Sequence, residues 1–446
     1  MRLPTINPVI LSAALNRCRV LLAAIALLTI IATHGSNASA DDLSTPANQA
    51  GNGEYRTPLA GEELHTTFMG EKVDVARMDR GNISALTLGA TFYTPKQGQI
   101  SGSPIGSLFL KRTWESSRTR NIISIFVNDL EYDKSFGNLE LVSRFDNSTI
   151  PGGQTETVKN REIKQSSVEW GTLAASVGPG LRYKVAPFQV DNDLRLQLLG
   201  KIGYFYAQRT DDTDPSLVLP PDTILYGAKL RVRYDGMRRN LLELPHAGVA
   251  AGFDLDFTHR DKWADFGSTE SSYKKSDTQN YAQFSGYLMG VAGIPGLSEK
   301  NRIFMSLHGG TMNSSSVDRY NCFRIGGGPL PGESDDLYRP NYPGTMFNNV
   351  LVGNYAMGAV EYRRELAFFM YLHLRETFIW ADRSTFISDI PLKFGFKSDS
   401  GAATTIGIDT GFFWDSSIYL DYSWDSGFIR DGKEGSGLIV TWNKSF

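Results

Sequence analysis

The chain has 446 residues, with 45 Lys and Arg against 48 Asp and Glu and a formal net charge of −3. A mildly acidic chain without clusters of Lys and Arg lacks the surface that phosphate backbones require, which excludes nucleic acid as a partner. The two cysteines and six histidines show no metal-ligand spacing, so the sequence predicts no disulfide framework, no cofactor and no metal.

The first predicted element is a secretory signal peptide over residues 1–40. Arg17 and Arg19 precede an apolar stretch, Val20 to Ala32, which the small residues Ala-Ser-Ala follow. This order of basic, apolar and small residues is typical of a cleaved export signal. A retained membrane anchor is the alternative, but the stretch is short for a spanning helix. Residues 41–63 are then expected to form a flexible periplasmic lead-in.

The rest of the chain repeats one unit, a run of about ten residues that is apolar at every second position. In residues 193–208, Leu194 and Leu196 share one face, while Arg195 and Gln197 share the other. A strand separates two such sets cleanly, whereas a helix scatters them. Fifteen stretches are expected to be strands: 83–94, 105–113, 121–132, 136–147, 168–185, 193–208, 223–235, 246–259, 280–292, 302–312, 350–364, 368–381, 401–413, 416–424 and 435–446.

The connections between these stretches alternate between short and long, which is the pattern of a transmembrane β-barrel. The charged face also carries Gly, Thr, Ser and Asn, and the apolar face carries aromatic residues near strand ends. A large secreted sandwich or β-helix is the alternative. We therefore predict an all-β fold, a transmembrane antiparallel β-barrel over residues 64–446, in the outer membrane of a Gram-negative bacterium.

The expected number of strands is sixteen, with fourteen or twelve as alternatives. Bacterial single-chain barrels have an even number of strands, so fifteen stretches imply that one strand is missing from the list. The alternation of short and long connections breaks before residue 136. The stretch Leu64 to Ala76 is therefore the candidate for the sixteenth strand.

The longest predicted connection, residues 313–349, carries the main functional hypothesis. It contains the consecutive glycines Gly326, Gly327 and Gly328, which allow sharp turns and close backbone packing. We expect this loop to fold into the lumen as a plug or gate. A surface loop without a special role is the alternative, since loop length alone does not distinguish the two.

The last predicted strand, residues 435–446, ends in an aromatic residue. Trp442 and Phe446 lie on its apolar face, so the strand is expected to close the barrel against the first strand. A final aromatic resembles the C-terminal signal by which outer-membrane proteins reach their insertion machinery. That signal usually has a second aromatic two residues earlier, where this chain has Lys444.

Three stretches within residues 220–446 resemble the barrel domain of the Omp85 superfamily, also called the surface antigen or D15 family. They read RVRYDGMRRNLLELPHAGVAAGFDLDF, FRIGGGPLPGESDDLYRPNYPG and GNYAMGAVEYRREL. The resemblance implies that the loop folds back into the barrel and that one of its arginines pairs with the wall. In the family that arginine precedes a glycine, whereas here Pro343 precedes Gly344, so Arg324 and Arg339 are the candidates for this role.

The resemblance also implies periplasmic POTRA domains before the barrel. Residues 41–82 are too short for even one of them, so a barrel without POTRA domains is expected.

Charges on the predicted wet face have mixed signs. Opposite charges on neighbouring strands are expected to pair and to fill the lumen, whereas a selective open pore would carry a ring of one sign. The predicted wall charges are Arg231, Arg233, Asp254, Asp256, Glu361, Arg363, Arg375, Asp409 and Asp421.

The sequence predicts a translocation or membrane-assembly pore gated by the inserted loop, with a passive diffusion channel for small solutes as the alternative. A barrel enzyme acting on lipid is a third hypothesis, because Ser306 and His308 share a strand face. No nucleophile motif surrounds them, so we predict no enzymatic activity. The expected partners are outer-membrane lipid and lipopolysaccharide, and the barrel-insertion machinery during biogenesis.

Overall fold

The structure is a computed structural model. It describes residues 55–446 except 97–98, 125–126, 150–152, 159–160, 186–191, 270, 327–337, 346–349, 390–391, 414–415 and 430–433. The predicted signal peptide therefore lies outside the described residues. Within the described part, no helix has the length and apolar character needed to cross a membrane.

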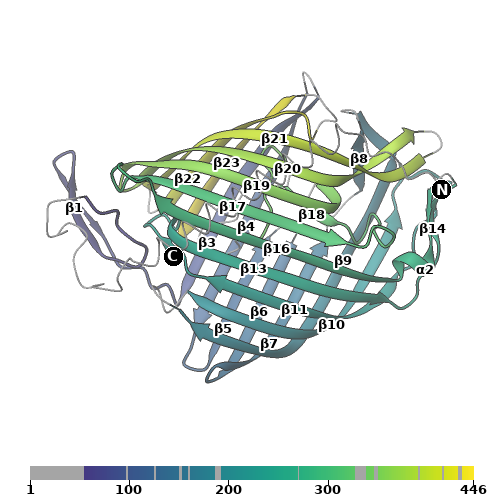
Figure 1. The fold of residues 1–446 in the computed structure, drawn as a ribbon, viewed down its shortest axis with the longest axis horizontal. Helices are drawn as coiled ribbons and strands as arrows, with labels where there is room; N and C mark the ends of the chain where they lie inside the picture. Colours follow the sequence, from purple (N-terminus) through teal and green to yellow (C-terminus); the bar gives the residue numbers. More distant parts are fainter. Residues whose placement is uncertain are drawn as a thin grey trace, which may run out of the picture.

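The strands close into one antiparallel barrel (Figure 1). Three short strands, β8 (Gln154–Val158), β12 (Arg238–Arg239) and β18 (Phe323–Ile325), belong to it but are bypassed, because the strands on either side of them also pair directly. The remaining sixteen strands of the described chain form the wall, which confirms the predicted barrel and its strand number.

The wall strands are β3 (Ile83–Lys96), β4 (Gln99–Thr113), β5 (Ser117–Ser124), β6 (Val127–Phe136), β7 (Leu139–Thr149), β9 (Arg161–Lys184), β10 (Asp193–Arg209), β11 (Thr223–Asp235), β13 (Pro245–Arg260), β16 (Asn280–Gly293), β17 (Asn301–Met312), β19 (Val350–Ala367), β20 (Met370–Asp389), β21 (Leu392–Phe413), β22 (Ser416–Asp425) and β23 (Gly435–Ser445). Between β13 and β16 lie β14 (Phe266–Ser268), β15 (Ser271–Tyr273) and the short helix α2 (Lys275–Thr278).

The sixteenth strand does not lie where the sequence suggested. Residues Leu64–Phe68 (β1) and Glu71–Val75 (β2) pair only with each other, so the wall begins at Ile83 and not at residue 64. The additional wall strand comes from the stretch 121–132, which divides between β5 and β6. The residues between them, Ile125 and Phe126, are apolar and carry no turn signal, so the pattern predicts a single strand there.

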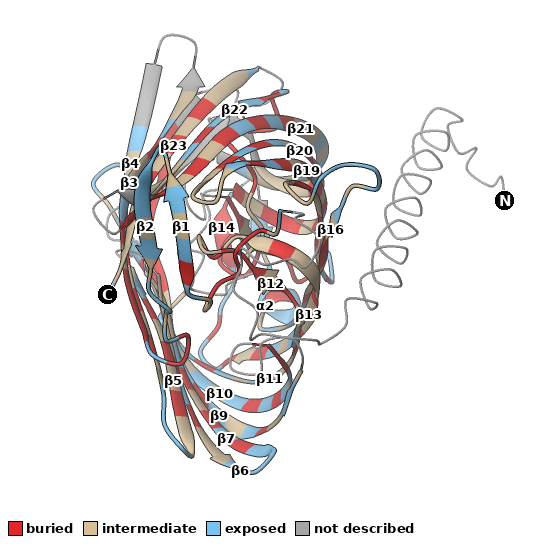
Figure 2. Cartoon of the chain, turned by 90° about the vertical axis from the view of Figure 1, so that its left-hand side faces the viewer, coloured by how far each residue is buried: buried red, intermediate tan, exposed pale blue. Residues whose placement is uncertain are grey.

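Alternation along the strands puts apolar side chains outside and polar side chains inside. On β10, Leu198 is 56 % exposed, whereas its neighbour Gln197 is 2 % exposed. Buried and exposed residues alternate in the same way around the wall (Figure 2). In outer-membrane barrels the short connections and both ends of the wall lie on the periplasmic side, which gives the orientation used below.

β23 closes the barrel against β3, in a continuous register from Gly437 opposite Tyr93 to Ser445 opposite Ala85. The two backbones approach closely at Gly89, where a Cβ atom would lie 2.2 Å from the carbonyl oxygen of Val440. Over this stretch, the pairing of β23 with β3 leaves no open strand edge facing lipid.

Replacing Gly89 with Ala should weaken this seam. The added methyl group meets backbone atoms that cannot move without breaking the ladder, so we expect a loss of about 1–3 kcal/mol in the free energy of unfolding. Urea unfolding in lipid vesicles, followed by the heat-dependent shift of the folded band on gels, measures it. The matched control is Gly200→Ala, whose Cβ would have its nearest neighbour at 3.8 Å. Equal stability of the two variants would contradict the prediction.

Candidate functional site

Opposite charges on β11 and β13 pair across the two neighbouring strands. Asp254 lies between Lys229 and Arg233, with its carboxylate oxygens 3.1 Å from Nζ and 2.7 Å from Nη1 respectively. Asp256, two residues further along β13, accepts a hydrogen bond from Lys201 on β10. This sector of the wall therefore pairs its charges within three consecutive wall strands, β10, β11 and β13.

Arg231 differs from its neighbours because it points across the lumen. Its Nη1 lies 3.0 Å from Oε2 of Glu131 on β6, which is four strands away around the wall. The buried carboxylate of Glu131 also lies 2.8 Å from Arg144 and 3.3 Å from Arg195. Four strands are thus joined through one side chain. Alternation puts Glu131 and Arg144 inside the barrel, but nothing local in the sequence shows that they meet Arg231.

Glu361 on β19 is the centre of a second ion-pair network. It accepts hydrogen bonds from Arg363 on the same strand and from Arg375 on β20, whose Nε lies 2.7 Å from Oε2. Glu361 is fully buried. These three predicted wall charges therefore form one compact unit.

His373 joins the remaining two predicted wall charges. Its Nδ1 lies 3.1 Å from Asp409 on β21, and its Nε2 lies 2.7 Å from Asp421 on β22. Tyr419 stacks on the imidazole ring and its hydroxyl donates to Asp421. Both carboxylates thus have a ring nitrogen of His373 as a partner, which joins β20, β21 and β22.

The loop between β17 and β19 enters the lumen over its described residues 338–345. At one end, the Tyr338 hydroxyl hydrogen-bonds to Ser285 on β16, and the guanidinium of Arg233 on β11 lies 4.3 Å from the centre of the Tyr338 ring. Burial raises the pKa of Tyr338 to about 12, so the phenol stays neutral.

The other end of this segment lies against the opposite wall. Gly344, with a φ of 73°, packs so closely on β23 that a Cβ atom on Gly437 would lie 2.6 Å from the Gly344 Cα. β11 and β23 are eight strands apart in the sixteen-strand order. The segment therefore crosses the barrel between opposite sides.

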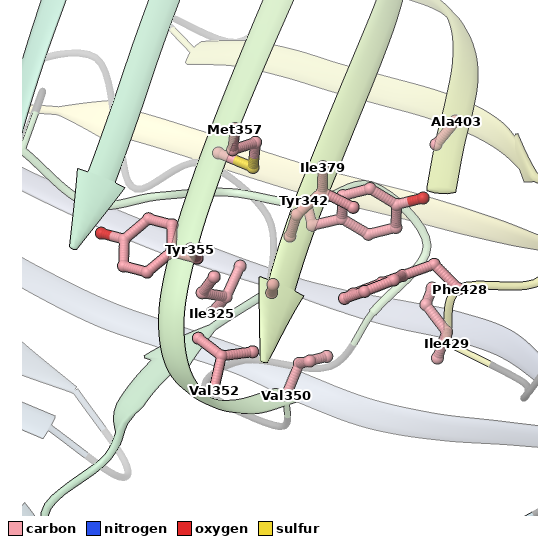
Figure 3. Packing of buried hydrophobic residues seen from close by; sticks show 11 residues of the cluster. Ile325, Tyr342, Val350, Val352, Tyr355, Met357, Ile379, Ala403, Phe428 and Ile429 are labelled. Atoms are coloured by element: carbon pink, nitrogen blue, oxygen red, sulfur yellow. The ribbon is translucent and has the colours of Figure 1, made fainter. Parts of the chain in front are cut away.

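Tyr342 anchors the middle of the crossing segment. It is fully buried, and its ring centre lies 5.3 Å from that of Phe428 in the loop between β22 and β23. Ile379 on β20 and Ala403 on β21 belong to the same buried cluster (Figure 3). This contact is apolar, whereas the contact at Tyr338 is polar.

Of the two candidate arginines in the loop, Arg324 reaches the distant wall. Its guanidinium lies 4.0 Å from the centre of the Trp170 ring on β9, and its Nη1 lies 3.3 Å from the Ser148 hydroxyl on β7. Arg339 is half-buried beside Tyr338. Gly326 has a φ of 121°. The other two glycines of the triplet, 327 and 328, lie outside the described residues.

An aromatic cluster, here called the extracellular lid, lies at the extracellular end of the barrel and includes Tyr320, from the part of the loop that follows β17. Loops between wall strands contribute Leu217, Trp263, Phe266 and Tyr320, which pack on Trp170 and Phe205 of the wall. Asp318 ties the loop to β13 through an ion pair with Arg260 at 2.5 Å.

Residues 55–82, here called the N-terminal cap, lie at the periplasmic mouth (Figure 2). The amide of Ala60 donates to the carbonyl of Arg239, at the turn after β11, over 2.9 Å. Arg80 forms a buried ion pair with Glu243 in the same turn. The cap therefore docks on the periplasmic turn between β11 and β13.

No family model matches the sequence, and no curated protein is similar to it. Solved structures with a similar fold include CdiB from Acinetobacter baumannii, at 11 % identity and a TM-score of 0.46, over 86 % of this chain and 65 % of that one. BamA from Haemophilus ducreyi, crystallised without POTRA domains 1–3, has 12 % identity, a TM-score of 0.48 and coverage of 86 % and 75 %. OmpT of Vibrio cholerae has 10 % identity, a TM-score of 0.36 and coverage of 84 % and 100 %.

The protein is an outer-membrane β-barrel. Its closed wall satisfies the backbone in lipid, and its exposed apolar face matches the lipid-facing surface of such barrels. CdiB and BamA, which are Omp85-family barrels, are thus among the solved structures whose fold is similar to that of this chain. At these identities the similarity concerns the fold alone.

The remaining candidate groups of the lumen are metal ligands and the pair Ser306 and His308. Among the described residues, no group of three or more His, Cys, Asp and Glu side chains could hold a metal ion. His308 on β17 faces the lumen and stacks on Tyr287 of β16, with ring centres 6.0 Å apart. Ser306 lies two positions before it on the same strand.

Replacing Glu131 with Gln should destabilise the barrel strongly. The change leaves several arginines facing a neutral amide, and breaking a buried ion pair from one side costs about 3–5 kcal/mol. Urea unfolding in vesicles gives the free energy of unfolding. Glu115→Gln, at an exposed position between β4 and β5, is the matched control and should change stability little. A small loss for both variants would show that the network across the lumen does not hold the wall.

Proposed function

We propose that the protein is a translocation or membrane-assembly pore held closed by its inserted loop. The observation that carries the proposal is the path of residues 338–345, which run through the lumen from β11 to β23. Its contacts include the Tyr338 and Tyr342 side chains and the close approach of Gly344 to β23, whereas the wall behind it is held by continuous ladders and ion pairs. The loop is therefore the part that could move without breaking the barrel.

A passive diffusion channel for small solutes is the alternative function. Similar folds among solved structures include channel proteins, such as an outer-membrane channel from Pseudomonas putida F1. The paired charges of the described wall favour the first proposal, because a solute-selective pore is expected to present charge of one sign. We assign transport or assembly and no catalysis, and we leave the client or solute open.

We also propose two partners. The exposed apolar face is expected to contact outer-membrane lipid and lipopolysaccharide. We expect the barrel-insertion machinery to recognise the C-terminal strand, because the Phe446 side chain is 70 % exposed. The amide of Phe446 donates to the carbonyl of Ser84 over 2.8 Å, so the backbone holds this side chain in place. Trp442 is held in place by a 2.7 Å hydrogen bond from its indole to Ser416.

Single-channel conductance in planar bilayers tests the gate. The intact barrel should stay closed, whereas deletion of residues 326–344 should produce discrete openings. A second variant, Tyr338→Ala with Tyr342→Ala, removes two side-chain anchors but keeps the loop, and should open intermittently. Tyr226→Ala, on the outer face, is the control and should stay closed.

Two results would overturn the gate. Steady, large conductance of the intact barrel would make the protein an open diffusion channel. Closed behaviour of both loop variants, with the folded gel band confirmed, would show that the loop does not block the lumen.

Replacing Phe446 with Ala should reduce the fraction of chain assembled in outer membranes by several-fold, while refolding into pure lipid vesicles should change little. The loss in cells reflects recognition, since the backbone bond of residue 446 remains. Heat-dependent gel shifts of isolated outer membranes measure assembly. Phe136→Ala removes an aromatic of similar exposure, 63 %, from the end of β6 and should leave assembly unchanged. Equal losses in cells and in vesicles would assign Phe446 a purely structural role.

A further inference from the structure

Glu376 lies on the lipid-facing side of the wall. The residue before it on β20, Arg375, faces the lumen and takes part in the ion-pair network described above, and Thr377 is 1 % exposed on the same side. Alternation along the strand therefore turns Glu376 outward. Its outward neighbours on β20 are Leu374 and Phe378, which are 51 % and 54 % exposed. A carboxylate thus interrupts an apolar outer face.

The depth of Glu376 places it in hydrocarbon. It follows Phe369, in the periplasmic turn before β20, by seven residues. At about 3.3 Å per residue and a strand tilt of about 40°, Glu376 lies about 18 Å above this turn, within an apolar band of about 25 Å. Ionisable side chains at such a depth are rare in membrane proteins, and they pair with other polar groups.

Glu376 is hydrogen-bonded on one side only. The Thr404 hydroxyl on β21 donates to Oε2 of Glu376 over 2.6 Å. Its other oxygen, Oε1, forms neither a hydrogen bond nor an ion pair with any residue that the structure describes. The register partner of Glu376 on β19 is Val360, which is apolar and 43 % exposed. The carboxylate therefore requires a further donor from outside the barrel.

The outer surface differs in height on the two sides of Glu376. On one side, beyond Val360 toward the extracellular end, the outward residues are small: Gly309 on β17, and Ala356 and Gly358 on β19. On the other side they are large and project from β21 and β22: Ile406, Tyr422 and Trp424, which are 51 %, 48 % and 43 % exposed. The surface around Glu376 therefore has a low side and a high side.

We propose that this surface, centred on Glu376, is the contact between two copies of the chain in the outer membrane. A two-fold axis along the membrane normal keeps every residue at its own depth, so it brings a second Glu376 and a second Thr404 to the carboxylate. The same axis lays the low side of each copy on the high side of the other. The second copy thus supplies a donor for Oε1, either the Thr404 hydroxyl or a carboxyl group that shares its proton.

A second copy fits this surface better than lipid or an unrelated protein does. Acyl chains offer no hydrogen bond to Oε1. An unrelated partner needs a donor at this one depth and a matching relief, whereas the two-fold axis supplies both from the chain itself. The inference does not depend on the loop gate, because the contact lies on the outer face of the barrel.

Cysteine crosslinking provides the first test. Leu374→Cys is placed in a full chain carrying Cys18→Ser and Cys322→Ser, and the barrel is refolded into dilauroylphosphatidylcholine vesicles. Copper phenanthroline should convert most of the chain to a disulfide-linked dimer, because position 374 lies beside Glu376 at the two-fold axis. The matched control is Leu198→Cys, at an outward position of similar exposure on β10, which should crosslink several-fold more slowly. Equal crosslinking of the two would reflect random collision and overturn the proposal.

The dependence of association on Glu376 provides the second test. Energy transfer between donor-labelled and acceptor-labelled barrels is measured while the vesicle protein is diluted with lipid, after the heat-dependent gel shift confirms folding. Glu376→Leu should lower the association constant about ten-fold, the effect of losing one strong hydrogen bond in lipid. Leu198→Ala is the control and should leave association unchanged. Association that is equally strong without Glu376, or a natural chain that stays monomeric, would contradict the proposal.

A photoreactive benzophenone amino acid at position 374 identifies the occupant in native outer membranes. Irradiation should yield an adduct at twice the mass of the chain, and this adduct should be lost when Glu376→Leu is added. An adduct with a different protein, or with lipid alone, would assign the surface another occupant and overturn the proposal.

Discussion

The structure depends on one constraint: in lipid, every backbone donor and acceptor of the wall must find its partner within the protein. The seam between β23 and β3 meets that constraint, because it turns a sheet with two open edges into a closed cylinder. Closure then separates the two faces of every strand. The outer faces can be apolar, whereas the charged side chains of the inner faces must pair with one another.

Alternation predicted the inner and outer faces well, since a period of two is a local property of a strand. The two errors in the strand prediction have physical causes. Residues 64–75 alternate enough to read as a wall strand, yet form a separate hairpin, because alternation does not say which sheet a strand joins. β5 and β6 merged into one predicted strand because Ile125 and Phe126 lack turn chemistry.

The contacts of the predicted site residues also divide into those that follow from the local sequence and those that do not. Pairs on adjacent strands, such as Asp254 with its neighbours on β11, could be anticipated because adjacency follows chain order. The contact of Glu131 with Arg231 could not, since it depends on how the cylinder is shaped in cross-section. The entry of this loop into the lumen was suggested by its consecutive glycines and by the family resemblance, but neither indicated that Tyr338 and Gly344 make the contacts. The wall charges and the loop therefore have different roles: the first brace the cylinder, and the second occupies its interior.

The N-terminal cap has a consequence for any passage through the molecule. It docks on the turn after β11 at the periplasmic side, while the crossing segment lies in the interior and the extracellular lid lies at the far end of the barrel. If all three segments block the path, they act as barriers in series. If they move independently, the probability of a continuous path is the product of their separate opening probabilities, so three modest barriers yield a very low leak. A ligand or client that releases all of them together would then raise permeability far more than the loss of any single closure.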